Sequence, residues 1–297
     1  MLTFASKRLY NCYRSLASCP LPPSFTGMAK MIVQQNGNPF ADLKISSWEP
    51  LKGVDGRAEC PECKRSRKFF CYTCYRLVGL SDPAVIPRVR LPLKVDILKH
   101  PLERVGKSTA VHARVLAPDD VTMYIHPNIP TYTDTSKLLL LFPKKMALTT
   151  AEAAQMMRDS SQLPGAGSDQ SGASVDPNPW SGLDRLVVID STWNGTNAIL
   201  KVAKLKITQF IVSMKDERVK DLPCVKLSEA ETHFWRPQRR QDSKHLATIE
   251  AIYYFFREMN ELINGRSYSG IYDNLLYFYA YQYGVVQQAQ KKRLEEL

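Results

Sequence analysis

Four cysteines stand in two pairs whose spacing is typical of a metal site. Cys60 and Cys63 form one C-x2-C pair, and Cys71 and Cys74 form the other after seven intervening residues. Each pair can offer two thiolates to one ion from a tight turn, and two pairs complete a tetrahedron around zinc. An extracellular disulfide framework would be denser and lie in a shorter chain. We therefore expect a reducing compartment and a four-cysteine zinc knuckle or ribbon over residues 58–76.

Two stretches combine cations with aromatic rings. The segment between the cysteine pairs carries Lys64, Arg65, Arg67 and Lys68. The second stretch follows Trp235 and carries Arg236, Arg239 and Arg240. Side chains of this kind can grip a phosphate backbone, so both stretches are candidates for RNA contact. Each stretch could also be a set of surface charges that faces only water.

A carboxylate stands where an apolar strand gives way to a predicted helix. Leu186 to Ile189 is the clearest strand pattern in the chain, and Asp190, Thr192 and Trp193 follow it. Ligands of open α/β sheets bind beyond the carboxyl ends of the strands. A carboxylate there can act as a general base, and a tryptophan can stack on a base or face a sulfonium cation. By themselves these residues fit an N-cap followed by a core tryptophan at least as well.

The balance of charge favours a polyanionic partner without identifying one. The 297 residues carry 40 Lys and Arg against 29 Asp and Glu, which gives a net charge of +11. A basic surface releases counterions from phosphates, but a surface can also be basic without such a partner. No apolar run approaches the length that crosses a bilayer, so we expect no membrane span. The first 41 residues contain no acid, which fits a mitochondrial transit peptide or a flexible basic tail.

The elements that must position these residues alternate between strands and helices. Strands are predicted at 111–116, 121–125, 138–142, 186–189, 210–212 and 224–227. Helices are predicted at 147–158, with Thr149 or Thr150 as N-cap, and at about 194–204, and two long helices follow residue 245. This order indicates an α/β domain with a largely parallel sheet and flanking helices.

Two segments lie outside that domain by composition. Residues 1–45 have the character of a basic tail. Between residues 159 and 182, Ser, Gly and Pro supply 13 of 24 residues, which predicts a disordered insertion because such a segment cannot bury a core. The apolar pattern resumes on its far side, so 77–290 is one domain.

Five motifs in the same order resemble the DTW-domain family of tRNA-uridine aminocarboxypropyltransferases. The family is named for Asp-x-Thr-Trp, here residues 190–193. The paired cysteines precede it, as do His-Pro-x-Glu and a strand that ends in Phe-Pro, and Thr-x-Glu-Ala opens a helix downstream. The matching residues of these last three motifs are His100, Pro101, Glu103, Phe142, Pro143, Thr248, Glu250 and Ala251. The resemblance covers roughly residues 58–290. Ala247 is a departure, because the family usually has Ser there.

The resemblance implies a fold similar to the knotted SPOUT-type α/β methyltransferases. It implies transfer of the 3-amino-3-carboxypropyl group of S-adenosylmethionine to N3 of a tRNA uridine, in the D-loop, with 5′-methylthioadenosine as by-product. Asp190 is then the expected base, Thr192 orients it, and Trp193 is the platform for the unstacked uridine. The candidates for binding S-adenosylmethionine are His100, Glu103, Phe142, Pro143, Thr248 and Glu250.

Two alternatives to this function stay open at this point. One is a SPOUT-like RNA methyltransferase that uses the same pocket, and the other is a zinc-dependent RNA-binding protein without catalysis. All three have tRNA or another RNA as partner, and the sequence implies no protein partner. The resemblance implies a nuclear location, whereas the acid-free N-terminus fits a mitochondrial one.

Overall fold

The computed structural model describes residues 38–103, 105–144, 146–161, 180, 182–191, 222–228, 230–235 and 245–296. The described residues between 42 and 286 form one compact unit, and the described residues 38–41 and 287–296 fall outside it. In the first unit the amide of Lys44 donates to Asp273 Oδ2 at 2.6 Å. Packed structure therefore begins within the predicted tail of residues 1–45.

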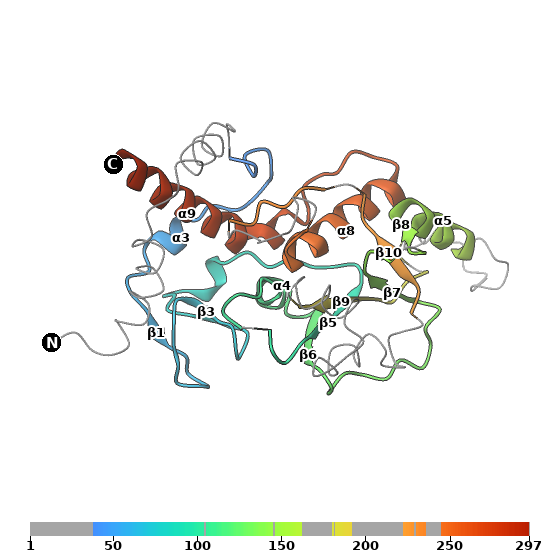
Figure 1. Cartoon of the computed structure of the whole chain (residues 1–297), viewed down its shortest axis with the longest axis horizontal. Helices are drawn as coiled ribbons and strands as arrows, with labels where there is room; N and C mark the ends of the chain where they lie inside the picture. The colour runs from blue at the N-terminus through green and yellow to red at the C-terminus, as the bar shows by residue number, and fades with distance from the viewer. Residues whose placement is uncertain are drawn as a thin grey trace, which may run out of the picture. The chain divides into compact units, whose positions relative to one another are not determined.

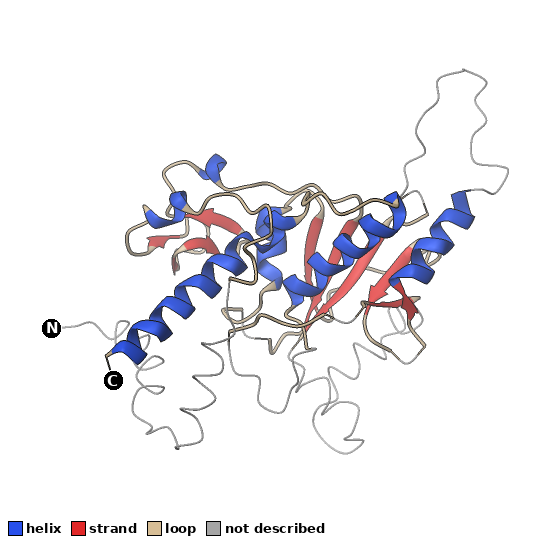
Figure 2. Ribbon diagram, turned by 90° about the horizontal axis from the view of Figure 1, so that it is seen from above, coloured by secondary structure: helices blue, strands red, loops and turns tan. Residues whose placement is uncertain are grey.

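The larger unit is built on a six-stranded parallel sheet (Figures 1 and 2). The strand order is β6-β5-β9-β7-β10-β8, and every neighbouring pair is parallel. The strands are β5 (Lys94–Lys99), β6 (Val121–Ile125), β7 (Leu138–Leu141), β8 (Leu148–Thr149), β9 (Arg185–Asp190) and β10 (Cys224–Lys226). The predicted strands at 121–125, 138–142, 186–189 and 224–227 and the largely parallel sheet are confirmed.

Helices α4 (Ala110–Leu116), α5 (Thr150–Ser161) and α8 (Thr248–Asn264) pack against the sheet. Helix α8 touches both α4 and α5, so the three helices cover one face (Figure 2). Apolar side chains of β5, β7 and β9 fill the core on both faces because a parallel sheet is covered on both sides. A 3-10 turn η2 (Asp273–Leu276) leads into α9 (Tyr277–Glu295), which confirms the second long helix. Among the described helices none combines the length and apolar character that crossing a bilayer requires.

The strand predicted at 111–116 is wrong, because these residues lie in α4. Polar His112 and Arg114 alternate with apolar neighbours, which is the pattern of a half-buried strand. In the fold His112 is buried, with its ring 5.4 Å from that of Phe70 and edge-on to it, and burial lowers its pKa to about 3. A neutral histidine thus fills an apolar position. The alternation of polar and apolar residues therefore does not indicate whether this segment is a strand or a helix.

Helix α5 begins after Thr149, whose hydroxyl accepts from the amide of Glu152 while the Glu152 carboxylate accepts from the Thr149 amide. This reciprocal capping confirms the predicted N-cap. The helix runs to Ser161, and Trp180 is buried beside Phe256, so described structure enters the predicted insertion from both ends. The predicted helix at 194–204 and strand at 210–212 lie outside the described residues.

A small antiparallel region precedes the sheet. It contains α3 (Glu49–Lys52), β1 (Ala58–Glu59), β2 (Ser66–Arg67), β3 (Phe69–Cys71), β4 (Arg76–Val78) and the 3-10 turn η1 (Pro83–Val85). Phe69 and Phe70 of β3 pack in one core cluster with Val111 of α4 and with Tyr277 and Phe278 of α9. The cysteine hairpin, residues 58–78, is therefore part of the main unit rather than a separate small domain.

Candidate active site

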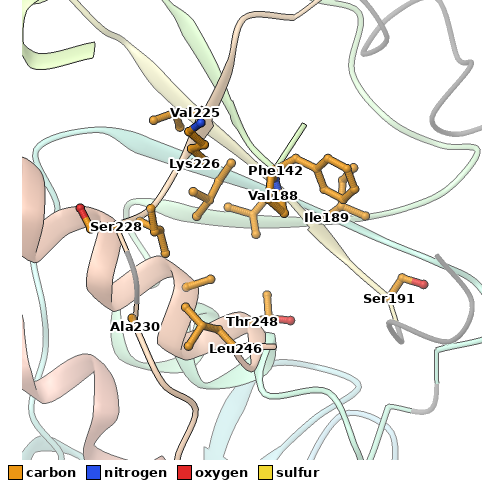
Figure 3. Close-up of a pocket in the computed structure, with 14 residues that line it drawn as sticks. Phe142, Val188, Ile189, Ser191, Val225, Lys226, Ser228, Ala230, Leu246 and Thr248 are labelled. Carbon is orange, nitrogen blue, oxygen red and sulfur yellow. The ribbon is translucent and has the colours of Figure 1, made fainter. Parts of the chain in front are cut away.

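A cavity lies where the carboxyl ends of β7, β9 and β10 meet the first turn of α8. Its volume is about 280 Å³, near the lower end of the range for small-molecule sites, roughly 300–1,000 Å³. Figure 3 shows Phe142, Val188 and Val225 on the strand side and Leu246 and Thr248 on the helix side. The other lining residues are Leu141, Pro143, Ile189, Ser191, Lys226, Leu227, Ser228, Ala230 and Ala251. This is the edge at which open α/β sheets bind ligands.

Asp190 is the last residue of β9 and lies behind the wall of this cavity. Its side chain is 3% exposed and does not line the space. One oxygen, Oδ2, accepts from Ser108 Oγ at 2.7 Å, and Oδ1 accepts from Thr248 Oγ1 at 2.9 Å. Burial raises the pKa of Asp190, while the hydrogen bonds from Ser108 and Thr248 and the charge of Lys99 work in the opposite direction. The carboxylate is thus linked to the cavity through the Thr248 hydroxyl.

The first turn of α8 supplies the helix side of the cavity. Thr248 lines it, and its backbone follows the N-cap residue Ala247, which has no side chain that can accept a hydrogen bond. The amide of Ile249 instead donates to Thr109 Oγ1 at 3.2 Å. Thr109 therefore performs from another element the capping that an N-cap hydroxyl usually provides.

Glu250 is also at the start of α8, but it does not line the cavity. It is 1% exposed and accepts from three donors: Thr232 Oγ1 at 2.6 Å, the amide of His233 at 2.7 Å and the amide of Ala247 at 2.8 Å. These contacts bind the segment around Thr232 to the helix start. Glu250 therefore holds the start of α8 in place, and the structure does not bring it to the cavity in which S-adenosylmethionine is expected.

The residues after β5 reach the same edge of the sheet from the other side. Lys99 stands opposite Asp190 in the parallel register and is 3% exposed, and its Nζ donates to the carbonyl oxygen of Glu103 at 2.7 Å. The amide of His100 donates to the carbonyl of Asp190 at 3.0 Å. Burial, followed by the charges of His126 and Lys99, lowers the pKa of His100. Neither His100 nor Glu103 lines the described cavity.

Of the predicted site residues, the structure brings Phe142, Pro143 and Thr248 to the cavity and Asp190 directly behind it. Thr192 and Trp193 lie outside the described residues. Sequence reasoning did not assign a role to Ser108 or to Lys99. The one signal was that a polar Lys-Ser-Thr stretch follows the residues that form β5.

The four cysteines converge as their spacing predicts. Their Sγ atoms all lie within 4.8 Å of one another, and Cys63 Sγ is 3.5 Å from Cys71 Sγ. Four sulfurs at about 2.3 Å from a tetrahedral ion would be about 3.8 Å apart, so the set fits a zinc ion. At Cys71 burial opposes ionisation, yet hydrogen bonds from the amides of Cys74 and Thr73 and from Arg67 lower its pKa to about 6. A thiolate is the form that binds a metal.

The basic residues of the hairpin divide by exposure. Lys64, Arg65 and Lys68 are exposed, whereas Arg67 is 5% exposed. The Arg67 guanidinium lies 3.9 Å from the centre of the Tyr72 ring and donates to Thr73 Oγ1. Arg67 is therefore occupied inside the hairpin and does not face a phosphate backbone. Arg236, Arg239 and Arg240 lie outside the described residues.

Comparison with known proteins gives a consistent set of relatives. The DTW domain matches residues 68–287. A Xenopus tropicalis protein named tRNA-uridine aminocarboxypropyltransferase 1 is 38% identical over 279 residues, which are 86% of this chain and 88% of that protein. Mouse and human proteins of the same name are each 36% identical over 273 residues, 85% of both chains. No solved structure matches the chain.

Proposed function

The chain belongs to the DTW-domain family, and on that premise we propose that it modifies tRNA by transferring a 3-amino-3-carboxypropyl group to N3 of a uridine. The observation that carries the proposal is the link from a buried carboxylate to a cavity at the carboxyl edge of the sheet. That link is the 2.9 Å hydrogen bond between Thr248 Oγ1 and Asp190 Oδ1. The names of the relatives supply the reaction, and the geometry supplies the residues.

N3 of uridine must lose its proton before it can attack a carbon. In this proposal the Thr248 hydroxyl accepts that proton and passes its own to Asp190, which makes Asp190 the final base. A raised pKa suits this role because it makes the carboxylate a stronger proton acceptor near neutral pH. Asp190 does not need to touch the uridine, and a hydroxyl in between keeps the buried carboxylate away from water.

S-adenosylmethionine, when bound, supplies the electrophilic aminocarboxypropyl carbon and leaves as 5′-methylthioadenosine. The protein must hold it so that this carbon rather than the methyl group faces N3, which is a matter of orientation. Phe142 and Pro143 support its placement in the cavity, since both line it from the end of β7. Trp193 follows Ser191, which also lines the cavity, and the proposal keeps it as the platform for the unstacked uridine, in the D-loop.

The sheet order supports a SPOUT-like, knotted fold as part of the proposal. Strand β9 inserts between the earlier strands β5 and β7, and β10 inserts between β7 and β8. Later strands that enter between earlier ones are what a threaded chain requires. Experimental coordinates for residues 192–221 and 236–244 would decide whether the chain passes through a loop.

The proposal also includes a zinc ion in the cysteine hairpin, with a structural role. Cys60, Cys63, Cys71 and Cys74 would hold the ion, and its role is to fix the hairpin rather than to take part in transfer. The exposed cations Lys64, Arg65 and Lys68 then stand on a rigid support for the tRNA backbone. The location proposed is the nucleus, and fluorescence microscopy of the tagged full-length chain distinguishes it from mitochondria.

The test is to incubate the full chain with S-adenosylmethionine and unmodified tRNA and to analyse the nucleosides by mass spectrometry. We expect a uridine that carries one aminocarboxypropyl group and an equal amount of 5′-methylthioadenosine. A methyl mass increment would identify a methyltransferase instead. Binding of tRNA without any product would support a non-catalytic RNA-binding protein.

A matched pair of variants tests the proton path. Thr248→Ala removes the hydroxyl, and we expect turnover to fall by about 100-fold or more, the scale of general-base catalysis. Thr248→Ser keeps the hydroxyl and should retain most activity. Equal activity in the two variants would refute a role for the hydroxyl.

A further inference from the structure

Two adjacent hydroxyls in the turn before α4 reach two different walls of the site. Ser108 Oγ donates to Asp190 at the end of β9, at 2.7 Å. Thr109 Oγ1 accepts from the amide of Ile249 in the first turn of α8, at 3.2 Å. One turn of the chain therefore contacts both the strand end and the helix start.

These contacts close a ring of hydrogen bonds, because Asp190 also accepts from Thr248 in the same turn of α8. The ring is partly shielded from water: Asp190 is 3% exposed, Thr109 is 6% exposed and Ile249 is 0% exposed, whereas Ser108 and Thr248 are half-buried. Buried hydrogen bonds are electrostatically stronger than exposed ones, and a buried group that loses its partner is costly. The ring thus fixes the distance between strand and helix at the cavity.

The turn itself has support from the hairpin. Gly106 lies beside the Tyr72 ring, since a Cβ at this glycine would be 3.9 Å from Tyr72 Cζ. Ser108 is two residues further along. The segment that carries the two hydroxyls therefore lies close to the hairpin two residues before Ser108.

We propose that Ser108 and Thr109 form a clamp that positions Asp190 and the start of α8, so that the Thr248 hydroxyl faces both the carboxylate and the cavity. Neither residue contacts the cavity, so both are positioning residues rather than catalytic ones. The clamp's effect on turnover rests on the proposed function, whereas its hold on α8 does not.

Ser108→Ala tests the strand side. It leaves a buried carboxylate oxygen without this donor, and we expect kcat to fall about 10- to 100-fold with a smaller change in KM, because a slightly misplaced group is costly in the reacting state. Ser108→Thr keeps the donor and should restore kcat. Ser136→Ala is the matched control, since Ser136 Oγ donates to Asp134 at 2.6 Å in an exposed pair before β7.

The pH profile separates positioning from a general loss of stability. In the part of the chain that the structure describes, the titratable and charged groups that act on Asp190 are Lys99 on β5 and Tyr75 in the hairpin. Removing the Ser108 bond takes away a contact that lowers the pKa of Asp190, so the acid limb of kcat should move to higher pH in Ser108→Ala. An unchanged kcat together with an unchanged acid limb would overturn the strand side of the clamp.

Thr109→Ala tests the helix side without any activity. We expect amide hydrogen exchange at residues 249–251 to become about 10-fold faster, the effect of one lost hydrogen bond, while Thr109→Ser exchanges like the wild type. Unchanged exchange in Thr109→Ala would overturn the helix side. If the wild type transfers nothing, the proposed function fails, and this exchange experiment still decides whether the clamp exists.

Discussion

Glu250 can be tested for one of two roles: it either holds the start of α8 in place or binds S-adenosylmethionine. Its motif position made it a candidate for binding the amino acid end or the ribose of S-adenosylmethionine, but its carboxylate accepts three hydrogen bonds from the protein itself. Two of these donors are the backbone amides of His233 and Ala247, which are partly buried, and a backbone amide withdrawn from water needs an acceptor. Replacing Glu250 should therefore lower stability first, and affect activity through the position of α8.

The expected loss in the free energy of unfolding follows from the number of hydrogen bonds that each substitution removes. Glu250→Ala loses three, and because the donors are only partly buried, water can compensate in part, so each loss costs about 1 kcal/mol. We expect a decrease of about 3 kcal/mol in the free energy of unfolding. Glu250→Gln can keep its oxygen towards Ala247 and Thr232 but then turns its amide group towards the His233 N–H. It should lose about 1–2 kcal/mol.

The assay is urea unfolding of the full chain followed by circular dichroism, in parallel with calorimetric binding of S-adenosylmethionine. Glu261→Ala is the matched control, because Glu261 lies on the exposed side of the same helix and pairs with Arg257 at 3.6 Å. A surface pair of this kind contributes at most about 1 kcal/mol. If Glu250→Ala unfolds at the wild-type midpoint and loses only affinity for S-adenosylmethionine, Glu250 binds S-adenosylmethionine directly, and its role in positioning α8 is refuted.

Three further outcomes follow from the site and the hairpin. Asp190→Asn should lower kcat by about 1,000-fold while leaving the melting temperature equal or higher, because it removes a buried charge. Since folding raises the pKa of Asp190, its stabilising contribution is present at low pH and lost as pH rises through the raised value, so the variant's advantage in melting temperature should grow with pH; a constant difference would contradict this sign. Removal of the proposed zinc ion by a chelator should lower the melting temperature of the whole unit in one transition, because Phe69 and Phe70 belong to its core; a separate hairpin transition in calorimetry would count against it. Replacing Lys64, Arg65 and Lys68 by Ala should reduce the salt dependence of tRNA affinity by about 2 in log–log slope, measured by filter binding, and an unchanged slope would exclude the hairpin as a contact.

Strands β7 and β9 were predicted because their burial is expressed in their own residues. The apolar runs of β7 and β9 lie inside a parallel sheet, where both faces are covered. Strand β5 was not predicted because it contains Asp96 and Lys99, which are 1% and 3% exposed. The partners that make the Asp96 charge tolerable are distant in sequence: Arg185 Nη1 donates to Asp96 at 2.7 Å, and Tyr132 Oη donates to it at 3.0 Å. Only the folded sheet brings them together.

The motifs identified which polar residues gather at the carboxyl edge, but they did not distinguish the roles of two carboxylates. Glu250 accepts from two backbone amides, which keep their protons and cannot relay one, and from the hydroxyl of Thr232, which does not line the described cavity. Asp190 accepts from the hydroxyls of Ser108 and Thr248, and a hydroxyl can take a proton on one lone pair while giving another away. One of those hydroxyls belongs to Thr248, a residue that lines the cavity. Among the described residues a hydroxyl therefore links the cavity wall to Asp190 and not to Glu250, and this difference depends on which hydroxyl the fold brings to the cavity, which no spacing of residues encodes.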